Sequence, residues 1–566
     1  MFVFLLKTDI GIVYLFKPCY NFYMVVKKES KEKIITTYNA KQGYWYVHTD
    51  SYYWDSEKKQ TRHKRKTIGK KLIENGPIIY NSRYLLEHPE IIEKQERATK
   101  VSPRVSTTKS LGEIRLLDSV VRDLGLRKHL TKAFNKNKSD KIIALAEYLI
   151  CTEKALSWAG SWADDKDLAI SNILSQDVSK ILESLSTDER TTFSQEWIKA
   201  HKCKKGYFCF DSTNISSYST TASPHLDYGY AHGHISRPQI NLAILSRQDN
   251  FTPVQSLLYN GSTHDSTTIN SLIEGLNKLE LQNIIITLDR GYYSQNNIKT
   301  IMESHNSFIM PVPKRVLWQY KEIDTVKTEL NSVKASVDVE RDNGEIETIY
   351  CVRKLVKREG HRFYLYVVYN PQVRSDEEIR FRALMRNCYD ELLSGALLEA
   401  HSVYYERFFE VKETPKRGRQ VTEKFSLEEE FNKKYAGYWC LLSNEKRDRS
   451  EIYHAYSQRN TAELFYDILK NDLNGDMVRS HNNKTFEGKM FITFIALIIL
   501  SKLKKKFAEL RVGNKTLNRV KSYRELLFKM SSLTEVSFSE KYKPMYSRPT
   551  KIQAEVIDKF DVNWPI

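Results

Sequence analysis

Two short apolar runs in this 566-residue chain each lead into an aspartate. Gly206–Phe210 precedes Asp211, and Ile284–Leu288 precedes Asp289. Runs of this kind predict strands that are buried on both faces. If the two strands are parallel neighbours, both carboxylates emerge at the same edge of a sheet, where α/β folds place their sites. A single aspartate at a strand end is more often a turn or cap residue, so the pair by itself leaves both interpretations open.

A third carboxylate lies in Ile452–Leu473, a segment predicted to be one helix. Its polar residues follow the pattern Y-x2-R-x3-E-x6-K, and offsets of three, seven and fourteen residues fall on one stripe of a 3.6-residue helix. The stripe would present a phenol, a guanidinium, a carboxylate and an ammonium group. An ordinary solvated face with Arg–Glu pairing is the alternative. The four residues are Tyr456, Arg459, Glu463 and Lys470.

Taken together, these residues resemble a known family, the DDE transposases of bacterial insertion sequences in the insertion-sequence-four superfamily. That superfamily is marked by the Y-x2-R-x3-E-x6-K signature. The resemblance also rests on Phe210–Thr213 (FDST) and Leu288–Tyr292 (LDRGY), and it runs from about Tyr44 to Leu500. It adds nothing for residues 1–43 or for those beyond about 530.

The resemblance implies an α/β fold with an RNase H-like, mixed-sheet catalytic core. A mainly β insertion domain would interrupt this core, and a helical N-terminal region would precede it. The insertion would lie between Asp289 and Glu463, whose separation of 174 residues leaves room for it.

It further implies that Asp211, Asp289 and Glu463 are the catalytic residues and the metal ligands of a transposase. Mg²⁺ prefers oxygen ligands, and three carboxylates can hold two such ions roughly 4 Å apart. Mn²⁺ could replace Mg²⁺. The reaction would be hydrolysis and transesterification of DNA phosphodiester bonds, with Asp211 bridging the ions.

DNA contacts follow from the same resemblance. Arg459 and Lys470 would hold phosphates near the transposon end, and Tyr456 would add a hydroxyl or a stacking face. Arg290 is a further candidate for phosphate binding. The partners would be double-stranded DNA, both the terminal inverted repeats and the target, and a second copy of the chain, because two ends must be brought together.

Composition agrees with a nucleic-acid partner. The formal net charge of +18 favours a polyanion, although a basic protein without such a partner is the alternative. Seven scattered cysteines without a C-x-x-C pair favour reduced thiols in a cytosol. Met1–Met24 lacks the features of a signal peptide. The eleven apolar residues Met490–Leu500 are too few to span a bilayer, so we expect no membrane partner. The resemblance implies a place in the bacterial cytoplasm, at the nucleoid.

The elements that must position the carboxylates are predicted as strand, strand, strand, helix, strand, helix and strand between residues 204 and 312, a mixed α/β layer. Aromatics in Tyr44–Trp54 predict β structure. The basic run Lys58–Lys71 is either a solvated ribbon or a phosphate-contacting arm. The expected divisions are an unplaced segment 1–43, a basic β-rich region 44–110, a helical region for DNA binding or dimerisation 111–203, core parts 204–312 and 441–530, the insertion domain 313–440 and a tail 531–566.

Two other functions stay open. Another RNase H-like nuclease would share the carboxylates but would not need the Tyr-Arg-Glu-Lys stripe. A non-catalytic, transposase-derived DNA-binding protein could lose one of the acidic residues, and here all three are present.

Overall fold

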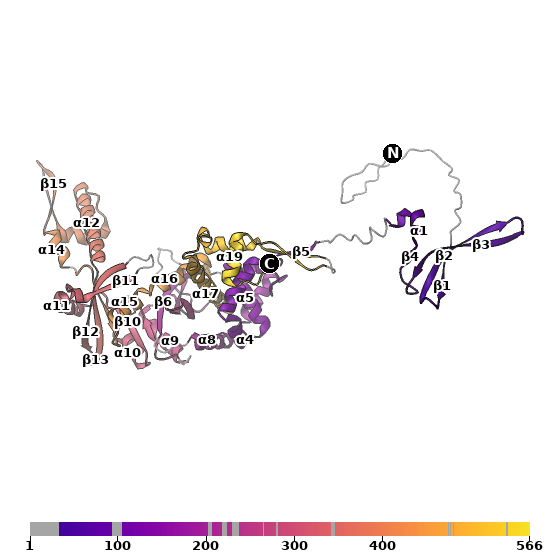
Figure 1. The fold of residues 1–566 in the computed structure, drawn as a ribbon. Helices are drawn as coiled ribbons and strands as arrows, with labels where there is room; N and C mark the ends of the chain where they lie inside the picture. Colours follow the sequence, from indigo (N-terminus) through magenta and orange to yellow (C-terminus); the bar gives the residue numbers. More distant parts are fainter. Residues whose placement is uncertain are drawn as a thin grey trace. The chain divides into compact units, whose positions relative to one another are not determined.

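The chain divides into two compact units, Met1–Arg104 and Val105–Ile566, called here the N-terminal unit and the main unit. Figure 1 shows the fold of each. The expectations for Met1–Met24 and for most of segment 1–43 lie outside the described residues. The computed structural model describes residues 33–92, 105–201, 206–217, 223–228, 237–263, 265–278, 281–340, 346–433, 435–473, 475, 477, 478, 480, 482–538 and 542–565.

The N-terminal unit is built on a four-stranded antiparallel sheet in the order β1-β2-β3-β4. The β structure predicted from the aromatics is confirmed, and the basic run forms the second arm of a long hairpin. Val47 and Ile68 are fully buried in this small sheet. The elements are β1 Lys33–Asn39, β2 Tyr44–Asp55, β3 Gln60–Lys71, β4 Ile79–Tyr80 and the short helix α1 Ser82–Glu87.

The main unit contains a ten-stranded mixed sheet. Its order is β11-β12-β13-β16-β10-β9-β6-β7-β8, and β17 also pairs with β6. The predicted order of strands and helices from β6 to β10 is confirmed. These elements are β6 Tyr207–Ser217, β7 Gln239–Arg247, β8 Thr252–Asn260, α9 Asp265–Lys278, β9 Ile285–Thr287, α10 Gln295–Glu303, β10 Ser307–Pro311 and, later in the chain, β17 Met477–Val478.

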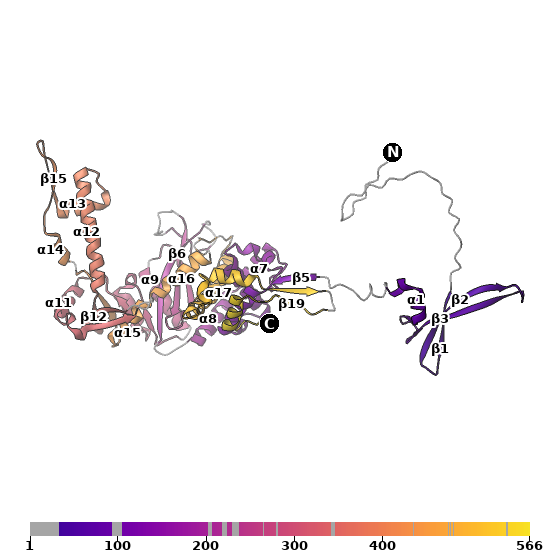
Figure 2. The same ribbon diagram turned by 45° about the horizontal axis from the view of Figure 1, so that its top comes forward.

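Helices cover both faces of the sheet, because its central strands are apolar on both sides (Figure 2). On one face, Phe208 and Phe210 of β6 pack into a core formed with α9 and α10. On the other, Cys209 of β6 packs with helices from the C-terminal half of the chain. Residues on β6 therefore alternate between two separate cores, and residue parity decides which core a side chain faces.

The helical region 111–203 is not a separate module. Its helices share one apolar core with α17 and with the C-terminal segment, where the sequence carried no interpretable signal. Strand β5, placed by sequence in region 44–110, pairs with β18 in the main unit. The elements are β5 Val105–Ser110, α3 Gly112–Asp123, α4 Leu126–Ala133, α5 Lys136–Thr152, α6 Ala159–Ala163, α7 Ser175–Glu183, α8 Thr187–His201, α17 Asn483–Arg511, α18 Tyr523–Ser531, β18 Thr534–Phe538, β19 Met545–Tyr546 and α19 Lys551–Phe560.

The apolar run Met490–Leu500 is confirmed as part of a buried helix, α17. None of the described helices combines the length and apolarity needed to cross a membrane.

The segment 313–440 differs from the mainly β domain expected there. Three of its strands extend the central sheet, and β16 pairs with both β13 and β10. A second part is largely helical and has its own small core. The elements are α11 Trp318–Leu330, β11 Ser336–Glu340, β12 Ile346–Arg358, β13 His361–Tyr369, α12 Pro371–Ser394, α13 Ser402–Phe408, β14 Phe409–Thr414, β15 Gly418–Glu423, α14 Leu427–Asn432 and β16 Tyr438–Ser443.

One glycine allows helices α7 and α17 to pack closely against each other. A Cβ added at Gly488 of α17 would collide with the backbone carbonyl of Leu182 in α7. We expect Gly488→Ala to lower the free energy of unfolding by about 1–3 kcal/mol, the usual cost of overpacking. Chemical denaturation followed by circular dichroism measures the change.

Gly275 of α9 is the matched control. A Cβ there would approach only the side chain of Gln255, at 3.4 Å. Gly275→Ala should leave the stability unchanged or raise it by up to about 1 kcal/mol, because alanine is the better helix former. Equal effects of the two substitutions would contradict a close approach of α7 and α17.

Candidate active site

The first two aspartates lie side by side on parallel strands. β6 and β9 pair in parallel, with Cys209 opposite Thr287. Asp211 and Asp289 each follow two residues after this pair, so the register brings them to the same level. The expectation of two strand-end aspartates holds only for Asp289. β6 continues to Ser217, which places Asp211 inside the strand, because β7 and β17 go on pairing with it beyond the end of β9.

Residue parity places Asp211 on the same face of β6 as Cys209. That face packs against helix α16, Asn460–Asp467, through Ala462 and Phe465. The helix before it, α15, Arg449–Ser457, covers the neighbouring part of the same face. The two helices therefore lie over the aspartates.

The predicted single helix Ile452–Leu473 is wrong in one respect, since α15 ends at Ser457 and α16 begins at Asn460. Arg459 is the N-cap residue of α16, and Glu463 lies in its first turn. The chain then enters a π-helical turn, Ile468–Asp472, that contains Lys470. No glycine or proline marks these irregularities. π-helical turns are rare and are frequent at functional sites.

Arg459 links two of the carboxylates. Its Nη1 forms an ion pair with Oδ1 of Asp289, and its Nη2 lies 3.9 Å from Oε1 of Glu463. Its guanidinium carbon lies 5.3 Å from the ring centre of Tyr456. The side chain of Arg459 is 22% exposed, whereas that of Glu463 is 69% exposed. The guanidinium of Arg459 is thus mostly buried, whereas the carboxylate of Glu463 is exposed to solvent.

Asp211 is tied to the same helix through its backbone. The hydroxyl of Tyr466, one turn after Glu463, donates a hydrogen bond to the carbonyl oxygen of Asp211. The thiol of Cys209 donates to the carbonyl oxygen of Arg459 at 3.6 Å. Sequence reasoning assigned no role to Tyr466. Its spacing from Glu463 is the only signal that could have pointed to it.

Electrostatics join Asp211 to the cluster as well. Burial lowers the pKa of Arg459, but neighbouring oxygens favour its charged form, and the net result is a raised pKa. Those oxygens belong, in order of effect, to Tyr456, Asp289, Asp211 and Glu463. The guanidinium therefore interacts with all three carboxylates. Burial raises the pKa of Tyr456, which keeps its phenol protonated near neutral pH.

The other two predicted contact residues lie at the margins. Arg290 directly follows Asp289 at the start of a short 3-10 turn, Arg290–Tyr292, and is exposed. Lys470 is half-buried in the π-helical turn. The stripe predicted for a regular helix is therefore distorted between Tyr456 and Glu463 and again before Lys470.

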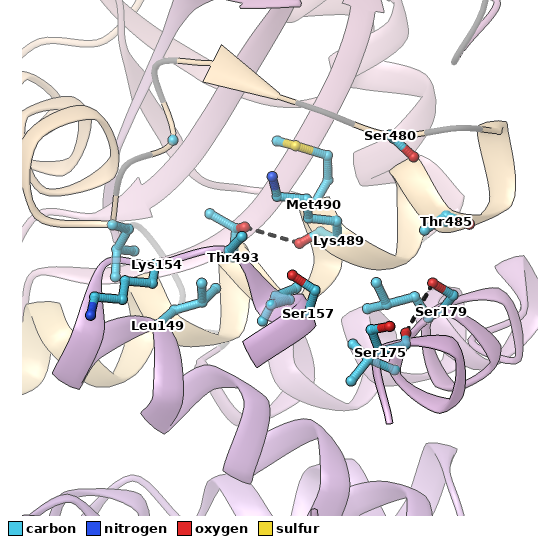
Figure 3. Close-up of a pocket in the computed structure, with 16 residues that line it drawn as sticks. Leu149, Lys154, Ser157, Ser175, Ser179, Ser480, Thr485, Lys489, Met490 and Thr493 are labelled. Carbon is cyan, nitrogen blue, oxygen red and sulfur yellow. Dashed lines mark hydrogen bonds between the residues drawn. The ribbon is translucent and has the colours of Figure 1, made fainter. Parts of the chain in front are cut away.

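A separate hollow of about 360 Å³ lies among helices of the region 111–203 and α17. None of the three carboxylates lines it. Residues of α5, α7 and α17 line it (Figure 3). Two of its hydroxyls are already bonded to their own helices: Thr493 donates to the carbonyl of Lys489, and Ser179 donates to that of Ser175. The hollow therefore lies apart from the carboxylate cluster.

The profile of the family described as "Transposase DDE domain" matches residues 202–499, which include all three carboxylates. The match spans more than half of the chain, which belongs to this family. Members of the family are DDE transposases, and divalent metals are typical of them. A comparison with curated proteins found no match.

Among solved structures, the chain is similar to one described as "Cryo-EM structure of piggyBac transposase synaptic complex with hairpin DNA (SNHP)". The identity is 13% and the TM-score is 0.29, with 62% of this chain and 56% of that chain covered. The chain thus spans little more than half the length of that relative.

The hydrogen bond from Tyr466 to Asp211 generates a prediction. Tyr466→Phe leaves the partly buried carbonyl of Asp211 without this donor and should lower the free energy of unfolding by about 1 kcal/mol. It should also slow metal-dependent DNA cleavage by more than about tenfold, because small misplacements of reacting groups are costly.

Tyr148→Phe is the matched control. It removes a similar bond, from the Tyr148 hydroxyl to the carbonyl of Ala155 at 2.8 Å, away from the cluster. This variant should lose stability but keep the cleavage rate under folding conditions. If both variants cleave DNA at the wild-type rate, Tyr466 does not position Asp211.

Proposed function

We propose that the protein is the transposase of an insertion sequence and that it cuts and joins DNA with Asp211, Asp289 and Glu463 as its catalytic residues. The observation that carries the proposal is the meeting of these three carboxylates around Arg459, although they come from two strands and a helix that are far apart in the sequence.

The donor set suits two Mg²⁺ ions, or Mn²⁺ in their place. All three side chains offer carboxylate oxygens, which hard cations prefer. The thiol of Cys209, which lies on the same face of β6 as Asp211, is a poor competitor, because burial raises its pKa and keeps it protonated. Asp211, Asp289 and Glu463 would hold the ions, which when bound would activate the attacking hydroxyl and stabilise the leaving oxygen of the phosphodiester.

Arg459 would then have two tasks. Without metal, its guanidinium balances the negative charge of the cluster. With cations present, that charge is balanced otherwise, and Arg459 is available for a DNA phosphate, which its planar group can bind through two parallel hydrogen bonds. Lys470 and Arg290 would contact phosphates at the margins, and the protonated Tyr456 would donate a further hydrogen bond or stack on a base.

The finer classification is also part of the proposal. An RNase H-like core is supported by the antiparallel meander β6-β7-β8 and by β9 and β10, which run parallel to β6 on its other side. Membership of the insertion-sequence-four superfamily is supported by the Tyr456–Lys470 signature. The long segment between β10 and β16 has the expected place, although it is not mainly β.

We also propose a homodimer on DNA, since two ends of one element must be paired and C₂ symmetry is the default for two identical chains. The helical region 111–203, expected to serve DNA binding or dimerisation, and the C-terminal segment bury much of their apolar surface against each other. Sedimentation of the complex with end DNA counts the chains, and a single chain throughout the reaction would exclude the dimer.

The catalytic assignment is tested by amide substitutions. Asp211→Asn, Asp289→Asn and Glu463→Gln should each abolish cleavage and strand transfer while leaving DNA binding largely intact, because each removes a charge with little change of shape. Mg²⁺ should raise the melting temperature of the wild type but not of these variants, since a ligand stabilises the state that binds it.

Asp249→Asn and Glu509→Gln are matched controls. Both side chains are exposed, and both have surface ion-pair partners, Arg247 and Lys505. They should keep cleavage, strand transfer and the response to Mg²⁺. Wild-type cleavage in any of the three site variants would remove that residue from the active site. Cleavage without strand transfer by the wild type would favour a nuclease over a transposase.

The DNA contacts are tested separately. Arg459→Ala and Lys470→Ala should each weaken binding to end DNA about tenfold and flatten its salt dependence, because each removes one proposed phosphate contact. Lys299→Ala, an exposed residue of α10 that pairs with Glu303, is the control and should bind as the wild type does. Unchanged affinity in both test variants would show that the Tyr-Arg-Glu-Lys stripe does not contact DNA and is an ordinary helix surface.

A further inference from the structure

The hairpin β2–β3 extends beyond the sheet of the N-terminal unit (Figure 1). β1 pairs with β2 only from Tyr44 to Asp50, and β4 pairs only with Gly69 and Lys70 of β3. Residues 51–55 and 60–64 therefore form a two-stranded ribbon, and no third strand of the described chain pairs with it. At about 3.4 Å per residue, the ribbon is roughly 17 Å long.

Three consecutive aromatics on this ribbon are unusually exposed. Tyr52, Tyr53 and Trp54 are 59%, 49% and 64% exposed. Successive strand residues point to opposite faces, so Tyr53 lies on one face while Tyr52 and Trp54 lie on the other. On that second face, the ring of Tyr52 packs 4.5 Å from His63. A ribbon with large apolar groups on both faces is suited to insertion between two walls.

The charge of the ribbon points to a polyanion. Between residues 58 and 71 there are eight lysines and arginines and no acidic residue. Two nearby acids are already paired within the hairpin: Asp50 lies 3.3 Å from His63 and 3.6 Å from Arg65, and Asp55 lies 3.3 Å from Arg62. The third, Glu57 at the turn, is exposed and leaves the lysines and arginines of the run in clear excess.

Three cations of the ribbon and its turn remain for an external partner. Lys58, Lys59 and Lys64 are exposed, and none of them forms an ion pair with the described residues. Two of the three lie at the turn and the third on β3, so they extend along the ribbon.

We infer that the β2–β3 ribbon binds double-stranded DNA by entering the major groove, as a second DNA site separate from the carboxylate cluster. The major groove is about 12 Å wide and admits a two-stranded ribbon. Lys58, Lys59 and Lys64 contact phosphates at its edges, and the aromatics meet base edges, where the thymine methyl offers an apolar contact. Single-stranded nucleic acid fits less well, because stacking platforms line a groove of the protein, whereas these rings stand on both faces of a projecting ribbon.

This inference adds a DNA site to the proposed function but does not require catalysis. The full chain is tested without divalent metal, by fluorescence anisotropy with a labelled random 25-bp duplex. Lys58→Gln, Lys59→Gln and Lys64→Gln combined should weaken binding about tenfold or more. The slope of log K against log salt should shrink by about 2.7, or 0.9 for each lost phosphate contact. Tyr53→Ser with Trp54→Ser should weaken binding with little change of slope.

The control carries the same loss of charge within the same unit. Lys33, Lys41 and Arg83 are exposed and lie off the ribbon. Lys33→Gln, Lys41→Gln and Arg83→Gln combined should keep the wild-type slope to within about one unit. A ribbon variant with the wild-type slope, or a control with the larger loss, would overturn the inference.

Two competitors identify the groove. Methyl green, which occupies the major groove, should compete with the wild type, and netropsin, which occupies the minor groove, should not. The reverse result, or tighter binding of a single-stranded 25-mer that the ribbon variant loses, would show a different mode. At saturating DNA the ribbon variant should still cleave, whereas Asp289→Asn should still bind, so failure of this site and failure of the catalytic proposal are distinguishable.

Discussion

Three ionised carboxylates held at close range destabilise the folded state unless an opposite charge lies nearby, because like charges repel. In this chain the opposing charge is the guanidinium of Arg459, which is paired with Asp289, close to Glu463 and coupled to Asp211. The carboxylates that β6, β9 and α16 supply all lie around this cation. Arg459 lies at the junction of α15 and α16, and its carbonyl oxygen accepts a hydrogen bond from the thiol of Cys209. This bond holds its backbone against the sheet.

Much of this arrangement could be predicted from the sequence. The apolar runs before Asp211 and Asp289 predicted two central strands, and their parallel pairing is what places both residues at one level. The order of elements from β6 to β10 followed from apolar runs and helical spacing. The signature from Tyr456 to Glu463 identified the helix that covers this face. Each of these patterns is local, with a period set by the backbone itself.

The parts that could not be predicted depend on distant partners. β6 extends past Asp211 because β7 and β17 pair with it there, and the sequence around Asp211 does not encode those partners. The helix breaks at Arg459 without glycine or proline, since its side chain and carbonyl bind other elements. The C-terminal segment lacked a clear pattern because its strand β18 completes a sheet with β5, more than 400 residues earlier. The contribution of Tyr466 rests on one hydrogen bond across the core.

The pairing of β16 with β10 has a consequence for how such a chain can vary. The segment between β10 and β16 is not an independent insertion, because its strands β11, β12 and β13 join, through β16, the sheet that carries the aspartates. Excising the chain from β11 to β16 would remove the partner of β10 on one side and leave a row of unpaired amide and carbonyl groups, an edge that invites aggregation. Length changes in this lineage are therefore expected in the helical part around α12 and α13 and in the tip of the β14–β15 hairpin. The strands that join the two regions are expected to keep their length.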